Sequence, residues 1–103
     1  MRKFIVKCGK IKSIVKAETQ YEAFKKFITG LKSDDLKKLA ILMVAKDYKR
    51  EYVITTPTLL YLAGLIDADT CIVNIANACN CGIVDAVEIF AVKLKQYSSW
   101  WGE

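Results

Sequence analysis

The first thirty residues alternate between apolar and polar positions in a way that predicts a β-hairpin. Residues 3–8 and 11–17 are two strand-like runs joined by Gly9 and Lys10. A two-residue connection with glycine first suits a type II′ turn. If Cys8 lies opposite Ile11, one face of the hairpin is apolar and lines the core. That face consists of Phe4, Val6, Cys8, Ile11, Ser13 and Val15.

The other face of this hairpin is basic. In the same register it carries three directly opposed pairs, which are Lys7 with Lys12, Ile5 with Ile14, and Lys3 with Lys16. Opposed lysines repel each other, and cross-strand pairing normally disfavours them. A partner that bears phosphates would turn this repulsion into affinity. The plainer alternative is that the lysines keep an edge strand from pairing with neighbouring molecules.

A helix is predicted directly after the hairpin. Thr19 and Glu22 have the spacing of a capping box. Gly30 followed by Leu31 fits a helix end with its hydrophobic contact. Between these limits one helical stripe is apolar and consists of Tyr21, Phe24, Phe27 and Ile28. The sequence therefore predicts a ββα unit at the start of the chain.

Residues 33–55 fit two patterns. Ser33, Asp34 and Asp35 form a good helix start, whereas 40–45 is a continuous apolar run that also fits a buried strand. We favour a short helical turn, then a second hairpin that turns at 46–50 and returns at 51–55. Thr56-Pro57 opens a further short helix that ends at Gly64. The order of hairpin, Thr-capped helix and glycine stop therefore occurs twice.

The last third of the chain has weaker signals. Residues 67–81 are interrupted by Asp, Asn and Cys, and we expect a short strand or irregular segment at 71–75. From residue 83, helical spacing connects Ile83, Val87, Phe90, Ala91 and Leu94, with Asp85, Glu88, Lys95 and Gln96 largely opposite. The β-branched residues of 87–94 keep a strand as the alternative. The predicted fold class is α+β, with a small antiparallel sheet covered on one face by helices in a single domain, 1–103.

The charge is distributed unevenly along the chain. Residues 1–50 contain 14 of the 16 Lys and Arg residues and five acids, whereas residues 51–103 contain two lysines and six acids. This predicts a basic working surface in the first half. The hydrophobic fraction of 53% is high for 103 residues, which favours a homodimer that buries the excess through the second half.

The charge pattern selects the candidate nucleic-acid-binding residues. They are Lys3, Lys7, Lys10, Lys12 and Lys16 of the first hairpin, and Lys46, Tyr48, Lys49 and Arg50 of the second turn. Tyr48 could stack on an unpaired base, although such a loop is more often a solvated turn. With two arginines in the chain, bidentate base readout is scarce, so binding should be directed at the backbone with little sequence specificity.

The cysteines do not have the spacing of a zinc site. Cys79 and Cys81 form a CxC pattern, and the chain contains no histidine. A disulfide among Cys71, Cys79 and Cys81 is the alternative, favoured if the lysine-rich, glutamine-poor composition reflects a thermophile. Phosphate-binding glycine loops and common catalytic motifs are missing from the sequence. We therefore expect a non-enzymatic protein without metal, cofactor or small-molecule substrate.

The aromatic residues at the end of the chain, Tyr97, Trp100 and Trp101, are the expected oligomer interface. The start of the chain lacks the apolar run of a signal peptide, and the longest uncharged runs have 15 residues, so a cytoplasmic location is expected. The sequence thus predicts a small basic module that binds nucleic-acid phosphates. The alternative function is an assembly protein, for instance from a virus or mobile element, which self-associates through its apolar C-terminal half.

Overall fold

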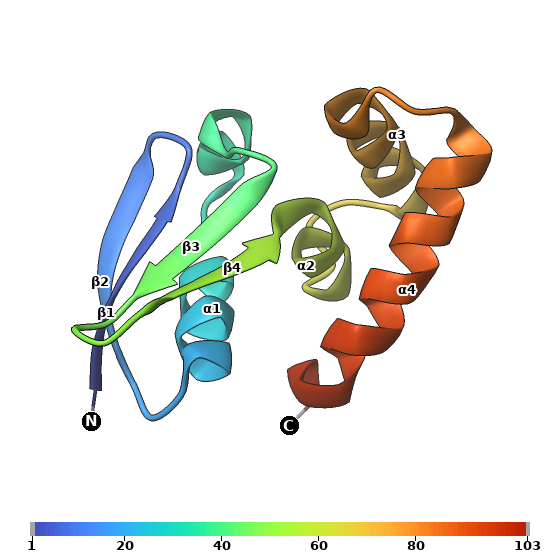
Figure 1. Ribbon diagram of the computed structural model, residues 1–103. Helices are drawn as coiled ribbons and strands as arrows, with labels where there is room; N and C mark the ends of the chain where they lie inside the picture. Colours follow the sequence, from blue (N-terminus) through green and yellow to red (C-terminus); the bar gives the residue numbers. More distant parts are fainter. Residues whose placement is uncertain (1, 103) are drawn as a thin grey trace. The chain divides into compact units, whose positions relative to one another are not determined.

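The computed structural model describes residues 2–102 and has an α+β fold (Figure 1). The predicted fold class is therefore confirmed. Contacts divide the chain into two compact units, one up to Thr56 and one from Pro57 onward. The elements in chain order are β1 Arg2–Cys8, β2 Ile11–Ala17, α1 Gln20–Thr29, the 3-10 helix η1 Ser33–Lys38, β3 Leu42–Lys46, β4 Glu51–Thr55, α2 Thr56–Leu62, α3 Ala68–Cys79 and α4 Ile83–Trp101.

The first unit is built on a four-stranded antiparallel sheet in the order β2-β1-β3-β4. The predicted register of the first hairpin is confirmed, with Cys8 opposite Ile11. Gly9 has φ 61°, and Lys10 keeps a negative φ, as a type II′ turn requires. The first strands of the two hairpins, β1 and β3, pair in the middle of the sheet, so β2 and β4 are its edges.

One face of the sheet packs against α1, and the core of the first unit lies between them (Figure 1). The buried side chains include Phe4, Val6 and Cys8 of β1, Met43 and Ala45 of β3, Ile54 of β4, and Phe24, Phe27 and Ile28 of α1. Tyr21, which the sequence places on the same stripe, is 45% exposed. The Thr19 hydroxyl accepts a hydrogen bond from the Glu22 amide at 3.2 Å, so the predicted N-cap is confirmed, whereas the Glu22 carboxylate accepts from the Glu18 amide at 3.3 Å and not from that of Thr19.

The segment between α1 and β3 is fixed against the end of the first hairpin. The Lys38 carbonyl accepts a hydrogen bond from the Lys10 amide at 3.1 Å. The Cys8 sulfur lies 3.2 Å from the Ala40 carbonyl oxygen and 3.3 Å from the Thr56 hydroxyl. The favoured interpretation of residues 33–55, a helical turn followed by a hairpin, is confirmed.

The second unit contains a helix where we expected a strand or irregular segment. The expectation for 71–75 is wrong, because α3 is continuous through it. The Asp67 carboxylate accepts a hydrogen bond from the Thr70 amide at 2.7 Å, and Asn80 ends the helix with φ 51°. The polar residues that suggested a loop are therefore the two caps of a helix.

The last helix, α4, is confirmed over the strand alternative, but its predicted apolar stripe is covered only in part, because Phe90 packs against the core whereas Val87 is exposed. Ala86 and Tyr97 are buried, whereas Ile83, Val84 and Val87 are exposed. Since both sides of α4 are apolar, periodicity alone does not determine which side packs.

Within the described residues, no single helix is long and apolar enough to cross a membrane. The pair α3 and α4 meets such a criterion only when taken together, and it is bent by 110°.

Candidate nucleic-acid interface

The sheet has a second face, opposite α1, and we call it the open face. It is formed by Lys3, Ile5 and Lys7 of β1, Lys12, Ile14 and Lys16 of β2, Leu42, Val44 and Lys46 of β3, and Glu51, Val53 and Thr55 of β4. Ile14 is 67% exposed, Val53 58%, Leu42 47% and Ile5 41%. The first hairpin therefore presents its lysines and isoleucines to solvent, as its predicted register requires.

The lysines of the open face form two rows. Lys7 lies opposite Lys12, and Lys3 lies opposite Lys16, with the Ile5–Ile14 pair between the rows. Lys3 and Lys7 are four positions apart on β1, so at the rise of an extended strand the two rows lie about 13 Å apart. Within a row, directly opposed Cβ atoms of an antiparallel pair are about 5 Å apart. Two pairs of ammonium groups therefore flank a short apolar strip.

These four lysines have no acidic partner among the described residues. The ion pairs within residues 2–102 are Arg2 with Asp47, Lys26 with Glu22, and Lys46 with Glu51 at 3.9 Å. The charge of Lys46 is therefore compensated by Glu51 on β4. Each row of the first hairpin keeps two uncompensated positive charges, and this is the strongest local concentration of charge on the open face.

The structure places the second basic cluster beside the first. Because β1 pairs with β3, Lys46 lies opposite Ile5, and the turn of the second hairpin lies at the Lys3 end of the sheet. Tyr48 is 87% exposed, and the Lys49 ammonium lies 5.5 Å from its ring centroid. The sequence did not predict this proximity, since it depends on which strands pair in the sheet centre.

The remaining candidates of the two turns have other surroundings. Lys10 lies at the opposite end of the first hairpin, in the turn that contacts Lys38. The Arg50 guanidinium lies 5.5 Å from the Tyr52 ring centroid. Lys10 is therefore remote from the cluster at the second turn, whereas Arg50 belongs to it.

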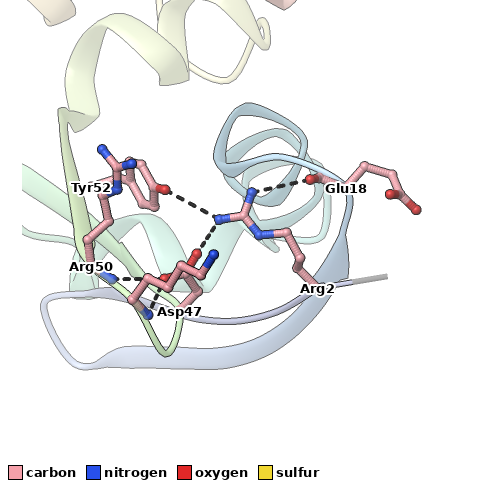
Figure 2. A network of polar contacts seen from close by, with 6 residues as sticks. Arg2, Glu18, Asp47, Arg50 and Tyr52 are labelled. Atoms are coloured by element: carbon pink, nitrogen blue, oxygen red, sulfur yellow. Dashed lines mark hydrogen bonds and ion pairs between the residues drawn. The ribbon is translucent and has the colours of Figure 1, made fainter.

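An acidic residue that the sequence reasoning overlooked holds the second turn in shape. Asp47 has a fully buried side chain, and its Oδ1 accepts hydrogen bonds from the amides of Lys49 at 2.7 Å and Arg50 at 2.9 Å. Its other oxygen pairs with Arg2, which also donates to the Tyr52 hydroxyl at 3.3 Å (Figure 2). An Asp that bonds amides two and three residues ahead is a known turn signal, which could have identified it.

The hydrogen bonds to Asp47 stabilise its charged form. The Arg50 amide, the Arg2 guanidinium and the Lys49 amide outweigh desolvation and lower the pKa of Asp47 to about 2. Arg2 belongs to β1, so this carboxylate ties the second turn to the first hairpin. The basic cluster is therefore presented on a fixed turn.

Replacing the buried carboxylate of Asp47 should lower the stability of the fold by an amount that depends on pH. We expect Asp47→Asn to be less stable than the unchanged protein near neutral pH, because the neutral amide forms a weaker interaction with Arg2. The folded-state pKa of Asp47 lies below its ordinary value of 3.8, so its charge stabilises the fold above that value. The stability difference should therefore close as pH falls through about 2. Urea unfolding of both proteins at several pH values measures it, and a pH-independent difference would contradict this role.

The cysteines are free thiols, so the disulfide considered among Cys71, Cys79 and Cys81 is not formed in the structure. Cys71 and Cys79 lie on the same helix eight residues apart, which is about 12 Å along its axis and too far for a bridge. Burial raises the pKa of Cys71 to about 11, and burial followed by the charges of Cys79 and Asp85 raises the pKa of Cys81. Neither thiol has the low pKa of a reactive cysteine. Residues 2–102 bring together no group of three or more Cys, Asp and Glu side chains that could hold a metal.

The aromatic residues expected at an oligomer interface are partly turned inward. Tyr97 is 5% exposed in the single chain. Trp100 and Trp101 are half-buried, and their ring centroids lie 6.0 Å apart. An interface role stays a prediction for all three residues.

Comparison with known proteins finds no matching family model, no similar curated protein and no similar solved structure.

Proposed function

We propose that this protein binds the phosphate backbone of nucleic acids through its open face, with little sequence specificity. The observation that carries the proposal is the pair of lysine rows, in which four ammonium groups share one exposed surface and have no acidic partner among the described residues. Phosphates would neutralise these charges and release counterions as they bind.

The position of β1 argues against a purely protective role for the lysines. Charged residues commonly shield an edge strand from pairing with other molecules. Lys12 and Lys16 lie on the edge strand β2 and could serve that purpose. Lys3 and Lys7 lie on β1, which pairs with β2 on one side and β3 on the other. An internal strand has no edge to protect, so these two lysines require another explanation.

The arginines indicate backbone binding in preference to base readout. Bidentate recognition of guanine is best suited to the planar guanidinium of an arginine that projects freely into a groove. Arg2 is engaged by Asp47 and Tyr52, and Arg50 lies against the Tyr52 ring. The freely projecting cations of the open face are lysines, which act as point charges toward phosphate. Contacts of this kind position a protein on nucleic acid and do not read its sequence.

Neutralising the lysine rows tests the proposal. If the unchanged protein makes four phosphate contacts, raising the salt concentration from about 50 to about 200 mM should weaken its binding to a short mixed-sequence duplex by about a hundredfold. In the variant Lys3→Gln, Lys7→Gln, Lys12→Gln and Lys16→Gln, we expect most of the affinity and most of this salt dependence to disappear. Fluorescence anisotropy with labelled duplex, single-stranded DNA and RNA at several salt concentrations measures both.

A matched control separates the lysine rows from net charge. Changing Lys32, Lys37, Lys38 and Lys93 to Gln removes the same number of charges from other elements, and most of the affinity should remain. Equal losses in the two variants, or no salt-dependent binding by the unchanged protein to any of the three nucleic acids, would contradict the proposal. The row variant should fold at least as well as the unchanged protein, because it loses two repulsive cross-strand pairs.

A further inference from the structure

The solvent side of α4 has the pattern of a helix-pairing seam. Residues at heptad positions a and d form a line along it, and we call this line the α4 seam. It consists of Val84, Val87, Ala91, Leu94, Ser98 and Trp101. Val84 is 75% exposed and Val87 43%, Ala91 and Ser98 are exposed, and Leu94 and Trp101 are half-buried. Within the second unit, Ala86 and Ile89 pack in the core from the other side of the helix, and Phe90 packs there from a position beside the seam.

The polar member of the seam is compatible with a packed position. The Ser98 hydroxyl donates a hydrogen bond to the Lys95 carbonyl at 3.3 Å within its own helix. Its donor is therefore satisfied without water, and a serine of this kind fits an apolar helix contact. Ala91, at the middle of the seam, has a small side chain that allows another helix to approach closely.

The charges beside the seam indicate which helix it fits. Glu88 and Lys95 both occupy heptad position e, both are exposed, and neither belongs to an ion pair among residues 2–102. Position e controls partner choice and orientation in helix pairs. A second α4 in antiparallel orientation places Val84 against its Trp101, Val87 against its Ser98, and Ala91 against its Leu94. In that register, Glu88 lies next to Lys95 of the second copy, and the two-fold axis repeats this pair.

The parallel arrangement lacks this complementarity. There, position e of one helix lies next to position g of its neighbour, and the g positions of α4 are the uncharged residues Ile83, Phe90 and Tyr97. Glu88 and Lys95 would then lack an opposite charge across the contact. The sequence of α4 is therefore self-complementary in the antiparallel orientation alone.

We infer that α4 is the docking surface for α4 of a second copy of this chain, packed antiparallel and fixed by two symmetric Glu88–Lys95 ion pairs. The dimer buries the valines that the isolated chain leaves in water, so apolar burial supplies its stability and the ion pairs set its register. This inference is independent of nucleic-acid binding, since it involves no residue of the open face.

Charge exchange across the contact tests the inference on the full chain. Analytical ultracentrifugation should show the unchanged protein as a dimer at micromolar concentration. Glu88→Lys alone and Lys95→Glu alone each place like charges together twice, and each should raise the dimer dissociation constant by about tenfold. The double variant, Glu88→Lys with Lys95→Glu, should return the dissociation constant to near its original value, because the pairs re-form with reversed sign.

Two valines of α4 provide a matched control for the apolar contact. Val84 and Val92 are both exposed, at 75% and 64%, but only Val84 belongs to the seam. Val84→Gln should weaken the dimer by about tenfold, and Val92→Gln should leave it unchanged. Because all these positions are exposed, each variant should keep the circular dichroism spectrum of the unchanged protein. A monomer at every concentration, equal effects of the two valine changes, or a double variant no better than the single reversals would each overturn the inference.

Discussion

Replacing Phe4 with alanine should lower the free energy of unfolding by about 3–5 kcal/mol. The Phe4 ring is fully buried on the α1 side of the sheet, and its centroid lies 6.3 Å from that of Tyr52. Removing it opens a cavity between the central strand and the helix, which the surrounding structure can fill only in part. Urea unfolding followed by circular dichroism measures the change.

The neighbouring residue provides the control for Phe4. Ile5 is on the same strand, but it points to the open face and is 41% exposed. Ile5→Ala should therefore cost less than about 1 kcal/mol. A cost for Ile5→Ala that equals or exceeds the cost for Phe4→Ala would mean that the two faces of β1 are assigned in reverse, and the position of the lysine rows would be wrong as well.

Replacing Gly9 with alanine is the other change with a large expected effect, and it should cost about 3 kcal/mol or more. Gly9 has φ 61°, a conformation that residues with a Cβ rarely adopt. A Cβ there would overlap the Lys38 carbonyl oxygen and lie 2.9 Å from the Ala40 amide nitrogen. Both neighbours are backbone atoms of the segment fixed against the hairpin, so neither can move without disturbing η1 or the entry to β3. Thermal and urea unfolding should both register the loss.

At Gly9, an alanine suffers both from the positive φ and from the overlap of its Cβ with backbone atoms, and Gly64 separates these two effects. It also has positive φ, at 77°, but an added Cβ would meet nothing within 4 Å. Gly64→Ala should therefore show the conformational cost alone, about 1–2 kcal/mol. If both glycine variants lose the same stability, the contact between the first turn and η1 contributes little.

The parts of the fold that the sequence predicted are those with local signals. The Gly9-Lys10 turn fixes the register of the first hairpin, and the alternation of residues then determines both faces. The cap at Thr19 determines the start of α1 in the same way. The order of hairpin, Thr-started helix and glycine stop also occurs twice in the structure, at β1–β2–α1 and at β3–β4–α2.

The parts that the sequence did not predict depend on packing between distant segments. Helix caps and loops are both rich in Asp and Asn. The residues around α3 therefore do not by themselves distinguish a capped helix from an irregular segment. The buried side of α4 depends on what α3 presents to it, since each side of the helix is apolar enough to pack. The proximity of Lys46 to the first hairpin depends on the β1–β3 pairing, and the hairpin sequences do not specify this pairing.

The central pairing of β1 with β3 also divides the open face into two halves of different character. Uncompensated cations gather over β1 and β2, whereas β3 and β4 carry Val44, Val53 and the Lys46–Glu51 pair. A polyanion bound to this surface would follow the first hairpin and meet an apolar and charge-balanced region at the midline of the sheet. Its footprint would thus be confined to a few consecutive phosphates, and the far half of the sheet would stay accessible to a different molecule.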